Sequence, residues 1–158
     1  MIIITVALFE VLFMFYMKEY YYSMAKSYLE QQVRYTQSSY DSTAMDSTSF
    51  QDKINNILEK ESLSQDSSYK EVNNDFAVAI EIINKNKEII LDQYGIKTNE
   101  VVNYEDVNKA LAGNEDYSFS ISSISETKDH IMSVSVPLKV NNVVEGVVRY
   151  SVSLNKAD

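Results

Sequence analysis

Residues 130–154 read HIMSVSVPLKVNNVVEGVVRYSVSL, and this stretch decides the fold. In its first half, from Met132 to Val140, apolar residues alternate with Ser, Pro and Lys, a period of two that predicts a half-buried strand. Asn141 and Asn142 follow, and asparagine tolerates the positive φ angles of a tight turn. A second alternating run then extends to residue 154. The stretch therefore predicts a β-hairpin whose apolar face must pack against another part of the chain.

Upstream, the same alternation recurs in shorter runs. Residues 76–82 and 89–91 flank an Asn-Lys turn and predict a first hairpin, and residues 117–122 alternate Tyr, Phe and Ile with Ser. Between them, residues 105–111 predict a short helix that ends at Gly113. Consecutive hairpins with a helical insert are typical of one antiparallel sheet, so we expect an α+β domain with five strands over residues 48–154.

The N-terminal segment has a different character. Residues 1–17 are apolar except for Thr5 and Glu10, and three tyrosines follow at 20–22. A spanning helix needs about 20 apolar residues and carries an aromatic belt at the water interface. We therefore predict a membrane-spanning helix over residues 1–22, truncated at its cytoplasmic end. The alternative is a cleaved signal peptide, for which Ser23-Met24-Ala25 offers a cleavage site, although basic residues are missing before the run.

Residues 18–40 predict a long membrane-proximal helix that continues this segment, because no Gly or Pro interrupts them. Two neighbouring apolar stripes recur at helical steps of three and four. One stripe contains Tyr21, Met24 and Tyr28, and the other contains Tyr22, Ala25, Leu29 and Val33. A wide stripe packs either on its own domain or on a second copy. Beside the membrane, the first stripe predicts the interface of a parallel homodimer.

A polar stretch at residues 41–49 predicts a loop before a second helix. Thr48 and Gln51 have the spacing of a capping box, in which two side chains satisfy the free backbone groups at the start of a helix. Phe50 and Ile54 begin an apolar face, so we predict that this helix ends near Glu61.

Composition excludes several kinds of function. The chain has 158 residues, no cysteine and a net charge of −9. The missing cysteines exclude disulfides, thiolate zinc sites and thiol nucleophiles, and the acidic balance argues against nucleic acid as a partner. Acidic residues are too freely spaced to fix a metal site, and no serine lies in a nucleophile elbow. We therefore expect no catalytic residue, metal or cofactor, and no enzyme activity in this fragment.

Arg149 is the leading candidate for ligand binding. It lies on the strand face opposite Val148 and Tyr150, where its guanidinium can bind a carboxylate with two hydrogen bonds. It can equally pair with Glu145, two pleats away on the same predicted face. The other candidates for a pocket are Tyr117, Phe119, Lys109 and Lys139.

Three segments resemble one known family. They are FAVAIEIIN at 76–84 with its Asn-Lys turn, EDVNKALAG at 105–113, and SVSVPL at 133–138 together with GVVRYSVSL at 146–154. In this order they resemble the extracytoplasmic PAS-like or single Cache sensor domain of bacterial transmembrane histidine kinases. Amino-acid-binding Cache domains carry a signature that includes a Trp, which this chain lacks.

The resemblance implies a function. It implies a domain outside the cell membrane that receives an unknown small-molecule or peptide signal. The signal would pass to a cytoplasmic kinase, absent from these residues, and then to a response regulator. Chemoreceptors and diguanylate cyclases carry similar domains, so the output module stays open, and a surface-anchored interaction domain is the competing class.

Overall fold

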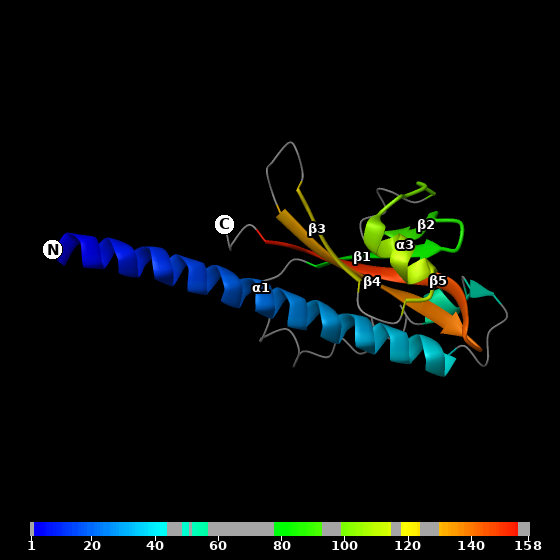
Figure 1. The fold of residues 1–158 in the computed structure, drawn as a ribbon. Coiled ribbons are helices and arrows are strands. Elements are labelled where there is room, and N and C mark those ends of the chain that lie inside the picture. The colour runs from blue at the N-terminus through cyan, green and yellow to red at the C-terminus, as the bar shows by residue number, and fades with distance from the viewer. Residues whose placement is uncertain are drawn as a thin grey trace.

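The computed structural model describes residues 2–43, 49–50, 52–56, 78–92, 99–114, 118–123 and 130–154. Its elements follow the predicted order (Figure 1). They are α1 (Ile2–Thr43), β1 (Val78–Asn84), β2 (Ile89–Asp92), α3 (Glu105–Leu111), β3 (Ser118–Ser123), β4 (His130–Val140) and β5 (Val143–Ser153). The predicted α+β class, with a long N-terminal helix and an antiparallel sheet, is confirmed.

The β4–β5 hairpin lies inside the sheet and organises it. The strand order is β2-β1-β5-β4-β3, and each neighbouring pair is antiparallel. Asn141 and Asn142 adopt φ angles of 49° and 65°, as expected for a tight turn of this hairpin. Because β1 pairs with β5 and β3 pairs with β4, residues 130–154 supply two of the three inner strands.

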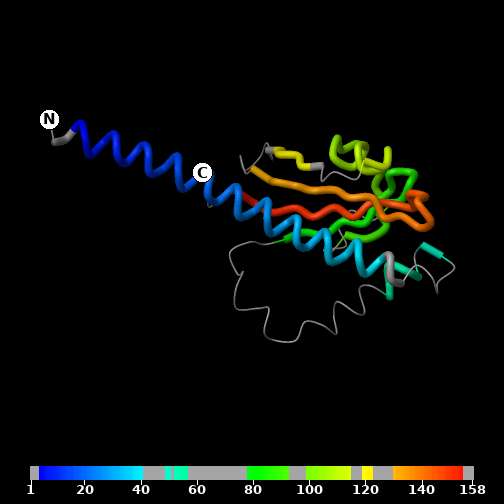
Figure 2. The backbone as a smooth tube through the Cα atoms, turned by 60° about the horizontal axis from the view of Figure 1, so that its bottom comes forward, coloured from blue at the N-terminus to red at the C-terminus, as the bar shows by residue number. Residues whose placement is uncertain are grey.

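Helices α1 and α3 lie on opposite faces of the sheet (Figure 2). On one face α1 buries Ala25, Leu29 and Val33 of the second predicted stripe, together with Thr36 and Tyr40, while Tyr22 of that stripe is half-buried. On the other face Val107 and Ala110 of α3 pack against Ile83, Ile89 and Val147. The sheet therefore separates two apolar cores.

The first predicted stripe flanks this contact. Tyr21, Met24 and Tyr28 are half-buried against the core on their own domain. Their role in a homodimer stays a prediction.

The N-terminal half of α1 projects beyond the sheet (Figure 1). All its side chains between residues 4 and 20 are exposed, including Phe9 at 69% and Tyr16 at 70%. Within the described chain, no helix is both long enough and apolar enough to cross a membrane. The membrane-spanning segment over residues 1–22 therefore stays a prediction. β5 ends on the side of the sheet from which this half of α1 projects.

Two boundaries near the end of α1 differ from the prediction. The helix continues to Thr43, so the loop does not begin at residue 41. Residues 50 and 52–56 are helical, and Ser49 caps them: its Oγ accepts from the Asp52 backbone N–H at 3.1 Å and donates to the Asp52 carboxylate at 2.6 Å. Ser49 and Asp52 thus form the capping pair one residue later than predicted. Thr48, Gln51 and the predicted helix end lie outside the described residues.

A bulge in β5 changes which way its side chains point. Leu138 lies opposite Gly146, but Lys139 lies opposite Val144, so Glu145 is an extra residue on β5. A bulge interrupts the alternation of a strand and turns a side chain toward the other face. Glu145 accordingly reaches the α1 face, where the Tyr40 hydroxyl donates to its carboxylate.

Candidate functional site

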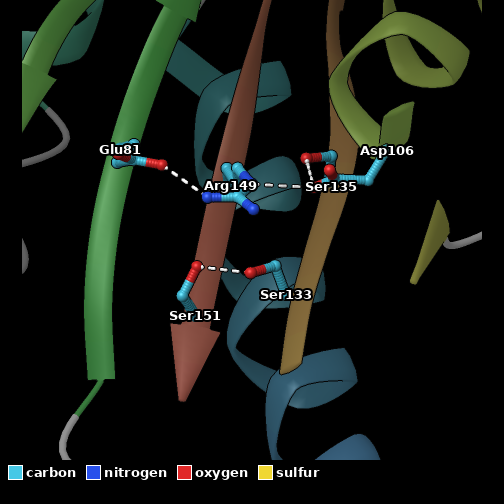
Figure 3. A network of polar contacts seen from close by, with 6 residues as sticks. All are labelled: Glu81, Asp106, Ser133, Ser135, Arg149 and Ser151. Carbon is cyan, nitrogen blue, oxygen red and sulfur yellow. Dashed lines mark hydrogen bonds and ion pairs between the residues drawn. The ribbon is translucent and has the colours of Figure 1, made fainter. Parts of the chain in front are cut away.

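Arg149 stands between two strands that present polar side chains to it. Glu81 on β1 and Ser135 on β4 are its direct neighbours across β5. Arg149 Nη1 donates to Glu81 Oε2 at 2.8 Å (Figure 3). Alternation along β5 directs Arg149 away from α1 and toward α3.

Asp106 brings α3 into this group. It lies in the first turn of α3, and its Oδ2 accepts from Arg149 Nε at 2.8 Å and from Ser135 Oγ at 2.7 Å. Tyr104, just before α3, places its ring 4.1 Å from Arg149 Cζ, a cation–π distance. The guanidinium therefore connects β1, β5 and α3. We call Glu81, Asp106, Ser135 and Arg149 the Arg149 cluster.

The Arg149 cluster is buried and contains one guanidinium and two carboxylates. Exposed fractions are 8% for Arg149, 7% for Glu81 and 2% for Asp106. Burial would lower the pKa of Arg149, but the charges and hydrogen bonds of Asp106 and then Glu81 outweigh burial and raise that pKa above its ordinary value. One cation therefore faces two carboxylates, and Asp106 Oδ1 has no hydrogen-bond partner among the described residues. A buried carboxylate oxygen that still lacks a hydrogen bond favours a ligand that donates one over an anion.

Hydroxyl groups continue the polar surface beside the cluster. Ser133 on β4 and Ser151 on β5 lie opposite each other, and their Oγ atoms are 2.8 Å apart (Figure 3). Ser133 is fully buried. The face of the sheet toward α3 thus carries Ser133, Ser135 and Ser151 beside Arg149, next to the apolar cluster that contains Val147.

The predicted pairing of Arg149 with Glu145 is wrong. Glu145 lies on the opposite face of the sheet, where Lys53 Nζ is 3.0 Å from its Oε2. Regular alternation would place residues 145 and 149 on the same face, and the bulge removes that relation. Burial would raise the pKa of Glu145, but hydrogen bonds from Tyr40 and Lys53 and the Lys53 charge outweigh it and lower that pKa.

Three of the other four predicted pocket residues make contacts away from Arg149. Phe119 packs on the α1 side, with Lys26 Nζ 4.9 Å from its ring centre. Lys109 is exposed and pairs with Glu105 at 2.7 Å. Lys139 Nζ donates to the Gly113 carbonyl at 3.4 Å. Tyr117 lies outside the described residues.

Sequence reasoning missed Glu81 and Asp106. Glu81 had a signal, because a lone carboxylate between Ile80 and Ile82 in a buried strand requires a partner. Asp106 had none, since an acidic residue in a first helical turn is common on solvent-exposed helices.

Comparison with known proteins identifies the fold. The chain is similar to the ligand-binding domain of the Pseudomonas aeruginosa PAO1 amino-acid chemoreceptor PctC in complex with GABA. That match has a TM-score of 0.55 and 15% identity and covers 88% of this chain and 59% of that one. It is also similar to the ligand-binding domain of the Campylobacter jejuni chemoreceptor Tlp3 in complex with 4-methylisoleucine. Here the TM-score is 0.53 and the identity 12%, with coverage of 89% and 57%.

These matches assign the chain to a structural class by its fold alone. The chain has the fold of bacterial chemoreceptor ligand-binding domains and spans less than three fifths of the two matched chains. No protein-family model and no curated protein matches its sequence.

Proposed function

We propose that this chain is an extracytoplasmic sensor domain, held at the cell membrane by residues 1–22, that passes a signal to a cytoplasmic output module. The observation that carries the proposal is α1 itself. One unbroken helix joins an exposed apolar segment to the sheet of a chemoreceptor-like domain. A movement of the sheet relative to α1 therefore reaches the predicted membrane segment without crossing a flexible joint.

The parent protein can be a histidine kinase, a chemoreceptor or a surface-anchored interaction protein, and these differ in their output module. A histidine kinase acting on a response regulator and a chemoreceptor are equally supported, since the similar structures are chemoreceptor domains. A membrane segment and a helix bearing a phosphoacceptor histidine in the parent gene beyond residue 158 would support the kinase. A surface-anchored interaction domain would have no output module there.

Membrane retention has a direct test. Mass spectrometry of the protein extracted from membranes should recover peptides from residues 1–25 and an intact N-terminus. A mature N-terminus at Lys26 would mean that residues 1–25 are a signal peptide and that the anchor is absent.

We propose further that the signal is a small molecule with a protonated amine, bound at the Arg149 cluster. The cluster holds one cation and two carboxylates, and Asp106 Oδ1 is a remaining buried acceptor within the described residues. An ammonium group donates hydrogen bonds and carries a charge opposite to that of the Asp106 carboxylate. An anion would have to displace Glu81 or Asp106 from Arg149.

Thermal unfolding of the 158-residue chain in detergent tests this ligand class. Simple amines, carboxylates and inorganic phosphate are added separately, and amines should raise the melting temperature. Asp106→Asn should remove that effect, while Lys109→Ala, an exposed change on the same helix, should keep it. If carboxylates or phosphate stabilise the protein and amines do not, the charge argument is wrong. If no compound acts, the cluster binds no ligand from these classes.

A further inference from the structure

Glu10 is the only charged residue among residues 2–17, in the half of α1 that projects beyond the sheet (Figure 1). Its side chain is exposed. The residues one turn before and one turn after it on the helix are Val6, Ala7, Phe13 and Met14, and none of these has a polar side chain. These neighbours on the helix therefore offer the Glu10 carboxyl group no hydrogen bond.

If residues 1–22 span the membrane, Glu10 lies at the least favourable depth. Tyr20 begins the aromatic belt that is predicted at the water interface. The helix rises by 1.5 Å per residue, so Glu10 lies about 15 Å along the axis from Tyr20. The hydrocarbon core is about 30 Å thick, which places Glu10 near its centre. A carboxyl group at this depth is costly unless it faces a partner.

Glu10 also lies on the line of the first predicted stripe. Alternating steps of four and three residues give one continuous series along the helix: Tyr28, Met24, Tyr21, Met17, Met14 and Glu10. Such a seven-residue repeat forms a seam along which two helices can supercoil. Met14 and Met17 are 70% and 47% exposed, so the series stays open to contact in the projecting half of α1.

A second copy of this chain fits the series because it brings the same group to the same place. In a parallel dimer, each residue of the seam meets its own counterpart across the two-fold axis. The two Glu10 side chains would therefore face each other. A protonated carboxyl group both donates and accepts a hydrogen bond, so two of them satisfy each other without a third group. A lysine at this position could not pair with its own copy, because it only donates.

We infer that the Glu10 carboxyl groups of two copies hydrogen-bond to each other inside the membrane. One copy alone cannot form this polar site. The inference rests on the proposed membrane anchor, and it extends the predicted homodimer from the stripe beside the membrane into the apolar segment.

Energy transfer between labelled chains measures the association. The 158-residue chain is placed in lipid vesicles with a donor or an acceptor dye on a cysteine introduced at Val143, which is 65% exposed in the hairpin. This cysteine is the only thiol, because the chain has none of its own. Dilution with lipid then gives the protein-to-lipid ratio at which half of the chains are paired.

Three variants separate the role of the carboxyl group. Glu10→Leu should weaken association by about 3- to 30-fold, the range that hydrogen bonds between membrane helices contribute. Glu10→Gln should keep the association close to that of the wild type, because an amide also donates and accepts. Thr5→Val is the matched control: it removes the other polar group of the segment, which lies about 140° away around the helix, and should change nothing.

Cysteine cross-linking in the same vesicles tests which face of the helix is used. Met14 and Leu12 are similarly exposed, at 70% and 65%, but only Met14 lies on the side of Glu10. Met14→Cys should therefore cross-link faster than Leu12→Cys. Adding Glu10→Leu to Met14→Cys should slow that cross-linking.

The anchor and the pairing fail in different ways. Insertion is checked first, by resistance of the wild-type chain to alkaline extraction, and release of the chain would overturn both proposals. If the chain is inserted but Glu10→Leu associates as tightly as the wild type, the pairing is wrong and the anchor stands. An inserted wild-type chain that stays monomeric, or equal cross-linking at positions 12 and 14, would also overturn the pairing. Glu10 would then face lipid, water or another helix of the parent protein.

Discussion

Arg149 bonds two buried carboxylates, those of Glu81 and Asp106, at 2.8 Å each. Replacing it with methionine keeps most of its volume but removes the cation that Glu81 and Asp106 share in this buried site. Removing one partner of a buried ion pair costs about 3–5 kcal/mol, far more than an exposed pair contributes. An ion pair near the surface would contribute less than about 1 kcal/mol.

Urea denaturation followed by circular dichroism measures this loss for Arg149→Met. Lys109→Met is the control, because the exposed Lys109–Glu105 pair should contribute less than about 0.5 kcal/mol. Equal losses in the two variants would contradict the buried character of the cluster.

Glu145 should make stability depend on pH in the acid range. Its pKa is lowered in the folded state, so its contribution is present above the unfolded value of about 4.3 and is lost as the pH falls through the folded value. The difference in unfolding free energy between wild type and Glu145→Gln should be largest above about pH 5 and should shrink below about pH 4. Denaturation curves at several pH values measure it. A difference that grows on acidification would contradict the sign of the shift.

At the scale of elements, alternation and turn chemistry predict most of the fold. Met132 to Val140, the Asn141-Asn142 turn and Gly113 after α3 are local signals, and each appears in the structure. The site is harder to predict, because Arg149 and Asp106 are 43 positions apart and meet only after α3 folds over the sheet. The bulge is equally hidden, because the extra residue is set by the hydrogen-bond register of β4 and β5 and not by composition.

Gly146, beside the bulge, has no room for a side chain. A Cβ there would lie 2.6 Å from the Ile83 carbonyl oxygen and would overlap the Phe50 ring. Gly146→Ala should therefore lower the unfolding free energy by about 1–3 kcal/mol, the usual cost of overpacking. Phe50→Leu in the same chain should recover only part of the loss, because the Ile83 backbone cannot withdraw. A neutral Gly146→Ala would show that β1 and β5 separate easily at this point.

At the scale of the whole molecule, the two halves of α1 have different surroundings. Its C-terminal half packs on the sheet, and its N-terminal half is exposed and apolar. Tyr21, Met24 and Tyr28 lie where these halves meet and are half-buried. They pack on their own domain, and the predicted homodimer would use the same side chains.

Cysteine cross-linking in membranes tests the parallel homodimer. Cysteines at positions 21, 24 or 28 should cross-link more readily than cysteines at 23 or 26, which the structure places in solvent. The chain has no other thiol, so each product reports one position. Uniform cross-linking around the helix, or none, would mean that the stripe packs only on its own domain.

The extra residue at position 145 also affects how this chain must be aligned with distant relatives. From Val148 to Val152, the even-numbered residues of β5 face α1. At the bulge, the odd-numbered Glu145 faces α1 instead. A relative without the bulge needs a one-residue gap between Val144 and Gly146. An alignment that omits this gap keeps the apolar pattern plausible and yet matches Arg149 to a residue on the wrong side of the sheet.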